Sequence, residues 1–307
     1  MTKVFIDGSA GTTGLRIHER LAERKDLSLL ILSDEQRKDP EARREMLHTA
    51  DIAFLCLPDA AAIEAVELAK GSKVRIIDTS TAHRTNPAWA YGFAELADLR
   101  AKIAASDRVA NPGCHASGVL ALIEPLIRNG LLSADAALSV TSLTGYSGGG
   151  KKMIAEYEDE NRSPLFGAPR QYALSQSHKH LPEIQVIGGL KTAPAFLPIV
   201  ADFYSGMEVT VPIFAKDLRG TIDDVRALYA DTFKGPMIHY NADMGEGGLL
   251  CASAFSGRDD MEVGVFGNAE RILLVSRFDN LGKGASGAAI QNMNIMLGVD
   301  ETTGLCV

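Results

Sequence analysis

The amino-acid sequence predicts an α/β fold in which a parallel, Rossmann-type sheet is followed by an α+β region with a mixed sheet. Over the first hundred residues, nearly continuous apolar strands alternate with helical segments, which is typical of a parallel sheet covered on both faces. Beyond residue 114, apolar positions alternate with polar ones and Gly/Pro turns become frequent. That pattern indicates strands with one open or partner-facing side. A chain of 307 residues has room for about two domains.

Each expected element is identified by the spacing of its apolar residues. Strands are expected at short apolar runs between turn residues, and helices where apolar residues recur three and four positions apart. The expected strands are 3–8, 27–33, 51–59, 74–80, those within 197–215, and 271–278. The expected helices are 15–24, 60–71, one that starts near residue 114, and one within 284–298.

Composition narrows the kind of protein. The net charge of −8 disfavours a nucleic-acid partner, because binding nucleic acid needs a basic surface. No apolar run approaches the roughly 18 residues of a membrane span, so no membrane partner is expected. No charged-then-apolar leader precedes the first strand, and the four cysteines show neither close pairing nor C-x-x-C spacing. A cytoplasmic protein without disulfides or a metal site is therefore expected.

A glycine-rich turn directly follows the first expected strand. Glycines at such a turn let the backbone approach a pyrophosphate, while the helix start and nearby hydroxyls supply hydrogen-bond donors. Three glycines can also simply form a turn, but their position at the start of a βαβ unit favours a dinucleotide-binding site. The residues expected to form this site are Gly8, Ser9, Gly11, Thr12, Thr13 and Gly14.

The end of the second expected strand carries conflicting signals about the cofactor. Asp34 stands where an acidic residue would accept the 2′-hydroxyl of NAD. Ser33 and Arg37, followed by Lys38, suit the 2′-phosphate of NADP instead. A solvated loop of mixed charge also explains this stretch. We expect NADP, bound here by Ser33 and Arg37.

Cys114 is expected at or just before the start of a long helix. Pro112 and Gly113 turn the chain, and from Ala116 onward apolar residues recur at helical spacing. Unpaired N–H groups and the positive end of the helix dipole favour a thiolate there and can stabilise an oxyanion on an attacked carbonyl. A small buried hydrophobic residue is the alternative. Placement alone leaves both interpretations open.

Two segments of the second region are candidates for further chemistry. His178 and His180 are two residues apart, so an extended segment would point both to one side, with Glu183 close behind. An imidazole beside a thiol can take its proton, whereas two surface histidines are the ordinary alternative and a metal site lacks a third ligand. The stretch 143–152 approaches a phosphate-binding P-loop but has Lys152 where a hydroxyl would hold magnesium. A loop whose Lys151 meets an anion, or a plain hinge, fits better.

The glycine turn at 279–284 precedes the last expected helix. That helix has Ala289, Ile290 and Met293 on one face. A turn of this kind is suited to lie against a cofactor, and we expect Asn280 and Gly284 to line its nicotinamide side.

Six segments in one order resemble the shorter type of N-acetyl-gamma-glutamyl-phosphate reductase, and the resemblance spans nearly the whole chain. They are GSAGTTG (8–14), DTSTAHR (78–84), YGFAEL (91–96), NPGC (111–114), SHKHLPEI (177–184) and DNLGKGASGAAIQNMN (279–294). One departure is His115, because the family usually has tyrosine after the cysteine. It puts in question which imidazole lies nearest the thiol, not which residue is the nucleophile.

The resemblance implies an NADP-binding Rossmann domain formed by 1–114 with a returning helix in 283–307, and an inserted catalytic and oligomerisation domain at 115–282. It implies a homo-oligomer, either a dimer or a tetramer. Cys114 would be the nucleophile, and His178 and His180 the base and a substrate contact, with His178 favoured as the base. Arg84 and Lys151 are candidates to bind the phosphate or carboxylate of the substrate, and Glu183 is expected to orient the acting imidazole.

The implied reaction reduces N-acetyl-L-glutamyl 5-phosphate to N-acetyl-L-glutamate 5-semialdehyde and phosphate, through a thioester on Cys114, in arginine biosynthesis. A related acyl-phosphate reductase such as aspartate-semialdehyde dehydrogenase would share the fold, cofactor and cysteine. A cysteine hydrolase would not need the glycine turn, and a non-catalytic dinucleotide sensor would tolerate loss of Cys114. Specificity for the acyl group resides in loops, so the sequence leaves it open.

Overall fold

The computed structural model describes residues 1–33 and 35–307, which form two compact units. Unit 1 comprises Met1–Ala94, Asp98–Pro112 and Ala285–Leu305, and unit 2 comprises Glu95–Ala97, Gly113–Gly284 and Cys306–Val307. Asp34, considered above as a ribose ligand, lies outside the described residues. Within the described ranges, no helix combines the length and the apolar character that crossing a membrane requires.

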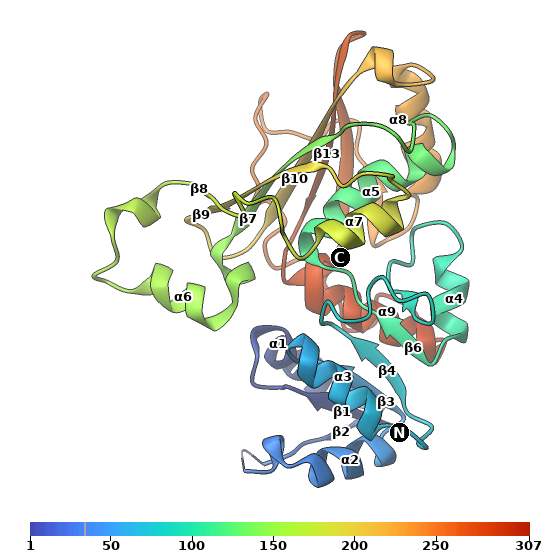
Figure 1. Ribbon diagram of the computed structural model, residues 1–307, viewed down its shortest axis with the longest axis vertical. Helices are drawn as coiled ribbons and strands as arrows, with labels where there is room; N and C mark the ends of the chain where they lie inside the picture. The colour runs from blue at the N-terminus through green and yellow to red at the C-terminus, as the bar shows by residue number, and fades with distance from the viewer. Residues whose placement is uncertain (34) are drawn as a thin grey trace. The chain divides into compact units, whose positions relative to one another are not determined.

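Unit 1 is built on a parallel sheet with the strand order β2-β1-β3-β4-β6-β5 (Figure 1). Its strands are β1 (Thr2–Asp7), β2 (Leu27–Leu30), β3 (Ile52–Leu55), β4 (Arg75–Asp78), β5 (Ala90–Tyr91) and β6 (Arg108–Ala110). The four strands expected here from the sequence are confirmed; β1 keeps the expected length but starts one residue earlier, and the other three are shorter than expected. Every residue of β3 is buried, as its continuous apolar run indicated.

Helices cover both faces of this sheet. The helices are α1 (Thr12–Ala22), α2 (Pro40–Thr49), α3 (Asp59–Leu68), α4 (Leu99–Ala105) and α9 (Gly287–Leu297). One core layer contains Ile17 from α1, Ile103 from α4 and Met293 from α9, all fully buried. The opposite layer contains Leu47 from α2 and Ala62 from α3. The predicted doubly covered parallel sheet is therefore confirmed.

The order of the strands fixes where unit 1 can bind a ligand. β1 has β2 on one side and β3 on the other, so the direction of the strand order changes at β1. In open α/β sheets, ligands bind at such a point, beyond the carboxyl ends of the strands. Asp7 ends β1, the glycine turn follows, and α1 begins at Thr12. The glycine turn thus occupies the position where this fold binds dinucleotides.

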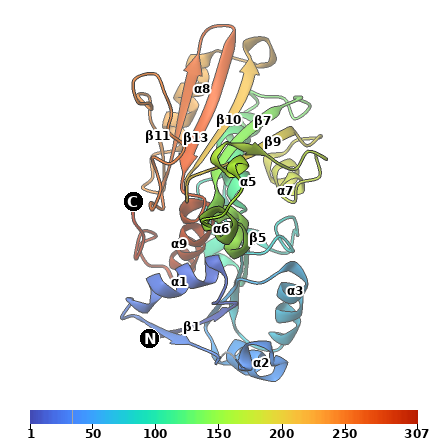
Figure 2. The ribbon, with the colours of Figure 1, turned by 90° about the vertical axis from the view of Figure 1, so that its left-hand side faces the viewer.

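Unit 2 contains a mixed sheet with the strand order β11-β12-β13-β10-β7-β9-β8. Its strands are β7 (Ser139–Gly145), β8 (Arg170–Gln171), β9 (Ala195–Ala201), β10 (Met207–Phe214), β11 (Ile238–Tyr240), β12 (Met261–Gly267) and β13 (Arg271–Phe278). β10 pairs antiparallel with β7 and β13, whereas β7 and β9 are parallel (Figure 2). Buried and more exposed residues alternate along β10, so one face is covered and the other open, as predicted.

The covered face carries the helix that begins at the cysteine. The helices of unit 2 are α5 (Cys114–Arg128), α6 (Gly150–Glu158), α7 (Leu181–Gly188) and α8 (Ile222–Thr232). A Cβ at Gly118 of α5 would stand 2.5 Å from a side-chain carbon of Val209 and 2.8 Å from the ring of Phe278. The absence of a side chain at 118 therefore lets α5 lie directly on β10 and β13. Twelve consecutive residues of α5, from His115 to Leu126, are buried.

Candidate active site

Cys114 is the first residue of α5, which confirms the helix start predicted from the sequence. Gly113 precedes it as N-cap in an extended conformation, with φ −79° and ψ 147°. The first N–H groups of a helix have no partner within the helix, and together with the helix dipole they favour an anion at this position. The Cys114 side chain is half-buried. It therefore stands where a thiolate and a negatively charged reaction intermediate are stabilised.

Glu183 fixes the residue that precedes Cys114. Its Oε1 accepts the N–H of Gly113 at 2.8 Å, and the side chain is 2% exposed. Glu183 lies in the first turn of α7, directly after Pro182. The sequence suggested that Glu183 orients an imidazole, and the contact found here is with the backbone at the start of α5. This contact ties the histidine-bearing segment to the helix that carries Cys114.

His178 and His180 lie on a turn that leads into α7, so the expectation of an extended segment is wrong. The N–H of Leu181 bonds to the carbonyl of His178 at 3.0 Å, and His180 has the helical angles φ −88° and ψ −9°. The two rings nevertheless lie together, with centroids 4.8 Å apart. Alternation by two does not distinguish an extended segment from a turn that ends in a helix.

The backbone N–H of His180 donates to Nδ1 of His178 at 3.2 Å. Burial, and secondarily the charge of Lys179, lower the pKa of His178 to about 4, so its ring is neutral at pH 7. A neutral ring that accepts at Nδ1 carries its proton on Nε2. His178 thus presents a hydrogen-bond donor at Nε2.

His115 takes part in the cluster from inside the protein. Its Nδ1 is hydrogen-bonded to Oγ of Ser142 on β7 and its Nε2 to the hydroxyl of Tyr172, each at 2.7 Å. Its ring centroid lies 5.4 Å from that of His178 and 5.6 Å from that of His180. Burial, followed by the charges of His178 and Lys179, lowers the pKa of His115 to about 3, so it stays neutral.

Tyr172 is a residue of the site that sequence reasoning missed. It follows β8, and its N–H donates to the carbonyl of Pro198 on β9 at 3.1 Å, which extends the strand pairing. Burial raises the pKa of its phenol, and the negative charge of Cys114 raises it further. The phenol belongs to the histidine cluster through its bond to Nε2 of His115. The sequence contains no local signal for this, because His115 is 57 positions earlier.

Gly284 and Asn280 occupy different surroundings. A Cβ at Gly284 would stand 2.9 Å from Cβ of Cys114, so Gly284 lies against Cys114. The amide of Asn280 accepts the N–H of Gly206 at 2.9 Å and donates to Oγ of Ser147 at 3.0 Å. Asn280 is 2% exposed, and both ends of its amide bind the protein. Its role as a contact to nicotinamide stays a prediction.

The two candidate cations for substrate differ in accessibility. Lys151 is exposed near the start of α6, after the glycine-rich stretch. Arg84, in unit 1, is 8% exposed, and it donates to the carbonyl oxygens of Asn111 and Thr79, both at 2.9 Å. These contacts hold the loop after β4. Substrate binding by either residue stays a prediction.

The glycine turn in unit 1 packs so closely that two of its positions have no room for a side chain. Gly8 has φ +88°, and a Cβ there would stand 2.3 Å from the carbonyl oxygen of Cys56. A Cβ at Gly14 would stand 2.4 Å from the carbonyl oxygen of Gly8. Glycine at 8 and 14 therefore permits the tight turn from β1 and its close packing on the start of α1, with Ser9, Thr12 and Thr13 in the same segment. This geometry fits a dinucleotide, whose pyrophosphate binds at such a helix start.

The candidate residues for the cofactor ribose follow β2. Ser33 is exposed, and its carbonyl accepts the N–H groups of Gln36 and Arg37, each at 3.1 Å. Arg37 is exposed as well, on the short helical turn Gln36–Lys38. Because β2 pairs in parallel with β1, this turn lies at the carboxyl ends of the strands, as the glycine turn does. Both side chains are accessible to a ligand.

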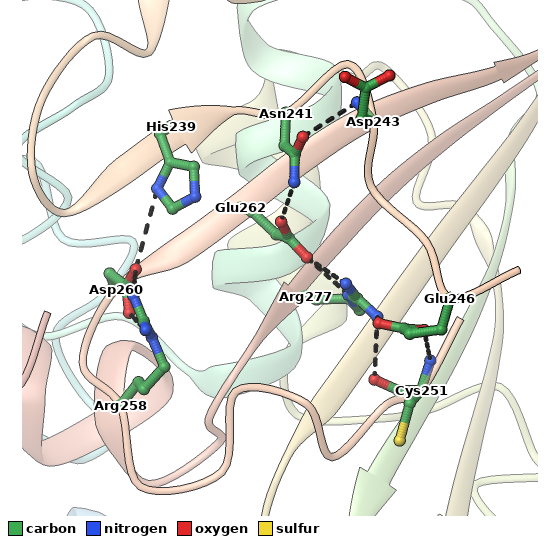
Figure 3. Close-up of polar contacts among 9 residues, drawn as sticks. All are labelled: His239, Asn241, Asp243, Glu246, Cys251, Arg258, Asp260, Glu262 and Arg277. Atoms are coloured by element: carbon green, nitrogen blue, oxygen red, sulfur yellow. Dashed lines mark hydrogen bonds and ion pairs between the residues drawn. The ribbon is translucent and has the colours of Figure 1, made fainter. Parts of the chain in front are cut away.

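A second polar cluster in unit 2 is joined by ion pairs (Figure 3). Arg277 on β13 is buried and forms ion pairs with Glu262 and Glu246, each at 2.6 Å. Arg258 pairs with Asp260 at 2.6 Å. These pairs join β12, β13 and the 241–258 segment. Within residues 1–33 and 35–307, no group of three or more His, Cys, Asp or Glu side chains is arranged to hold a metal ion.

Family models define the class of protein to which this fold and site belong. Residues 3–105 match the semialdehyde dehydrogenase NAD-binding domain, and residues 114–280 match the semialdehyde dehydrogenase dimerisation domain. The chain thus has a nicotinamide dinucleotide-binding domain and a dimerisation domain. Solved structures agree on the fold. Aspartate semialdehyde dehydrogenase II from Vibrio cholerae superposes with a TM-score of 0.73 at 18% identity, over 97% of this chain and 98% of that one.

Curated relatives are more specific. Proteins named N-acetyl-gamma-glutamyl-phosphate reductase from Brucella ovis and Brucella anthropi are 47% and 48% identical to this chain. The matches cover 96% of this chain and 99% and 98% of those proteins. The chain therefore belongs to the semialdehyde dehydrogenase family and, within it, to the N-acetyl-gamma-glutamyl-phosphate reductases. It is an oxidoreductase.

Proposed function

We propose that this chain reduces N-acetyl-L-glutamyl 5-phosphate with NADPH to N-acetyl-L-glutamate 5-semialdehyde and phosphate. The observation that carries the proposal is Cys114 at the first position of α5, directly before His115, whose ring clusters with those of His178 and His180, in a chain with reductase relatives. A thiol at a helix start, with imidazoles beside it, is the arrangement that nucleophilic attack on an acyl group needs.

Cys114 attacks the carbonyl carbon of the acyl phosphate as a thiolate. The C–S bond forms, the bond between that carbon and the phosphate oxygen breaks, and phosphate leaves. The N–H groups at the start of α5 stabilise the oxyanion of the tetrahedral intermediate. NADPH, when bound, would supply the hydride that reduces the thioester carbon. Cleavage of the C–S bond then releases the aldehyde and returns Cys114 as a thiolate.

The hydrogen bond at Nδ1 of His178 distinguishes the roles of the two histidines. Because Nε2 of His178 bears the proton, this ring donates to the leaving phosphate or to a carboxylate of the substrate. We assign acceptance of the thiol proton to His180, which reverses the preference drawn from the sequence. The bond from Gly113 to Glu183 keeps the histidine segment in register with Cys114.

Ser33 and Arg37 are proposed to bind the 2′-phosphate, which selects NADP over NAD. Gly8, Gly11 and Gly14, with Ser9, Thr12 and Thr13, are proposed to hold the pyrophosphate. Lys151 is proposed to contact the substrate phosphate. The open face of the sheet in unit 2 is proposed to pair with a second copy, in a dimer or tetramer, because an exposed apolar sheet face is unfavourable in water. A thiol nucleophile suits the reducing cytoplasm, where we place the reaction.

The reaction run in reverse tests the proposal. NADP, phosphate and one semialdehyde at a time are supplied, and NADPH is followed by its absorbance. N-acetyl-L-glutamate 5-semialdehyde is expected to give NADPH, and aspartate semialdehyde to give at most a small fraction of that rate. A preference for aspartate semialdehyde would mean that the chain acts as an aspartate-semialdehyde dehydrogenase instead. No NADPH with any semialdehyde would contradict the proposal altogether.

A further inference from the structure

We propose that Arg43 is a positioning residue for the cofactor, which holds the proposed 2′-phosphate turn in place relative to the glycine turn and thereby sets the preference for NADPH over NADH. Arg43 acts through its ion pair with Asp7 and not by touching the cofactor. The inference rests on the proposed binding of the 2′-phosphate by Ser33 and Arg37, and it concerns unit 1 alone.

The guanidinium of Arg43, on α2, is buried and all three of its nitrogens have partners within unit 1. Nε and Nη2 bind Oδ2 of Asp7 at 3.0 and 2.9 Å. Nη1 binds Glu64 on α3 at 2.7 Å, and Nη2 also donates to the carbonyl oxygen of Ala61 at 3.4 Å. Arg43 is 6% exposed and Asp7 is 3% exposed. Because the guanidinium is directed to these groups, its effect on a cofactor is indirect.

Asp7 is the residue from which the glycine turn starts. It ends β1, and Gly8 follows it with φ +88°. The carbonyl oxygen of Asp7 accepts the N–H of Cys56 at 2.8 Å, and a Cβ at Gly8 would stand 2.3 Å from the carbonyl oxygen of Cys56. The main chain of Asp7 is thus held by β3 and its side chain by Arg43. Asp7 is therefore a fixed reference point for the proposed pyrophosphate site.

Consecutive backbone hydrogen bonds connect Arg43 to the proposed 2′-phosphate turn. The N–H of Arg43 donates to the carbonyl oxygen of Asp39, the N-cap of α2, at 3.0 Å. The N–H of Asp39 donates to the carbonyl oxygen of Gln36, also at 3.0 Å, in the short helical turn that contains Arg37. The turn and the start of α2 therefore form one hydrogen-bonded segment. The pair of Arg43 with Asp7 attaches this segment to the end of β1.

A cofactor with a 2′-phosphate has to engage both turns at once, because its covalent bonds fix the separation of its phosphates. Two linked contacts strengthen binding only when the geometry allows both to form. NADH has no 2′-phosphate, so its binding does not depend in this way on the turn that contains Arg37. The ion pair of Asp7 with Arg43 therefore increases the ratio of the NADH dissociation constant to that of NADPH.

The test measures the dissociation constants of NADPH and NADH by fluorescence titration of the full chain, together with thermal melts. Arg43→Met is expected to lower the ratio of the NADH to the NADPH dissociation constant about tenfold, because the charge-assisted bonds to the 2′-phosphate are lost. The variant also leaves the carboxylate of Asp7 buried without its ion-pair partner, beside the glycine turn. That charge weakens both cofactors alike and cancels in the ratio.

The double variant Asp7→Val/Arg43→Met decides the outcome if the single variant does not fold. It removes both charges together, and an apolar pair in place of a buried ion pair is often well tolerated. We expect it to melt near the wild-type temperature and to bind NADH with nearly wild-type affinity, while the ratio stays about tenfold lower. Arg44→Met is the matched control, because it removes the same charge from the next, exposed position of α2. It is expected to leave the ratio unchanged.

A wild-type ratio in the double variant, or in a folded Arg43→Met, would overturn the inference even if the melting temperature falls, because the pair would then only stabilise the fold. An equally large fall with Arg44→Met would also overturn it, since the charge of α2 would then set the ratio. The proposed 2′-phosphate site fails by a different result. If the wild type does not prefer NADPH, or if Arg37→Ala leaves the ratio unchanged, that site is wrong. If Arg37→Ala lowers the ratio and Arg43→Met does not, the inference about Arg43 fails alone.

Discussion

Gly284 lies against Cys114 so closely that a Cβ at position 284 would stand 2.9 Å from Cβ of the cysteine and 3.2 Å from the carbonyl oxygen of Asp279. Ordinary contacts between such atoms are longer than 3.4 Å. The close contact at position 284 therefore limits where the Cys114 side chain can lie.

The Gly284→Ala variant is expected to fold but to lose at least about tenfold in kcat, because the added methyl group displaces Cys114 from its position at the helix start. Steady-state kinetics and a thermal melt measure this. Gly235→Ala is the control, since none of the described heavy atoms beyond its chain neighbours lies within 4 Å of a Cβ there. Unchanged kcat in Gly284→Ala would mean that the site tolerates a shifted cysteine.

Cys114→Ser is expected to bind NADPH with wild-type affinity and to lose essentially all reduction. An alcohol is far less ionised at neutral pH than a thiol at a helix start, so the covalent step stops while the fold persists. Fluorescence titration with NADPH and the reductase assay separate the two effects. Near-normal turnover would remove covalent catalysis from the mechanism.

The two histidines are expected to respond differently to substitution. His180→Asn should lower the rate of Cys114 alkylation at pH 7 and shift its profile upward, because the proton acceptor is lost. His178→Asn should leave alkylation nearly unchanged and mainly raise KM, because it removes a donor to substrate. Opposite behaviour would restore His178 as the base. If neither profile moves, the start of α5 alone accounts for the thiolate.

Acidification is expected to destabilise unit 2 through His115. Its pKa is about 3 in the folded protein, whereas its ordinary value is 6.5, so between these values the unfolded chain binds a proton that the folded chain does not. The free energy of unfolding therefore falls as pH decreases below 6.5, by about 2 kcal/mol between pH 7 and pH 5 for one such group. Urea unfolding of His115→Gln at both pH values should show a smaller difference than the wild type. An equal difference would mean that His115 is protonated in the folded state.

Arg37→Ala is expected to weaken NADPH about tenfold or more while changing NADH little, because NADPH alone has the 2′-phosphate. Lys73→Ala is the control. It removes an exposed positive charge just before β4, at the amino ends of the strands, whereas the glycine turn lies at their carboxyl ends. Dissociation constants for both cofactors give the comparison. Equal weakening of both cofactors would leave the 2′-position to other residues, Asp34 among them.

Local patterns in the sequence were sufficient for the features that depend on neighbouring residues. The apolar runs, the glycine turn after β1 and the start of α5 at Cys114 follow from periodicity and turn chemistry, and all three are confirmed. The contacts among Ser142, His115 and Tyr172 join residues 27 and 57 positions apart. No local pattern encodes which buried hydroxyl meets which ring, because strand order and sheet register decide it.

The partner of Glu183 illustrates the same limit, since Gly113 is 70 positions earlier. The spacing of Glu183 from the histidines suggested an imidazole contact, which stays a prediction, and gave no sign of the bond that its carboxylate accepts from the N–H of Gly113. Asn280 was expected to line the nicotinamide side of the cofactor, which also stays a prediction. Its bonds to Gly206 and Ser147 depend on two loops that the sequence does not place.

The continuous burial of α5 has a consequence for how the enzyme is inactivated. Amide hydrogens in a segment with no exposed face exchange with solvent when the surrounding unit opens as a whole, not by local fraying. Cys114 directly precedes that segment, and the absence of a side chain at Gly118 lets the following turn lie directly on β10 and β13. We therefore expect that heat or denaturant does not change the reactivity of Cys114 gradually. The enhanced reactivity of its thiol persists until the sheet of unit 2 unfolds cooperatively, and that reactivity is lost in the same transition.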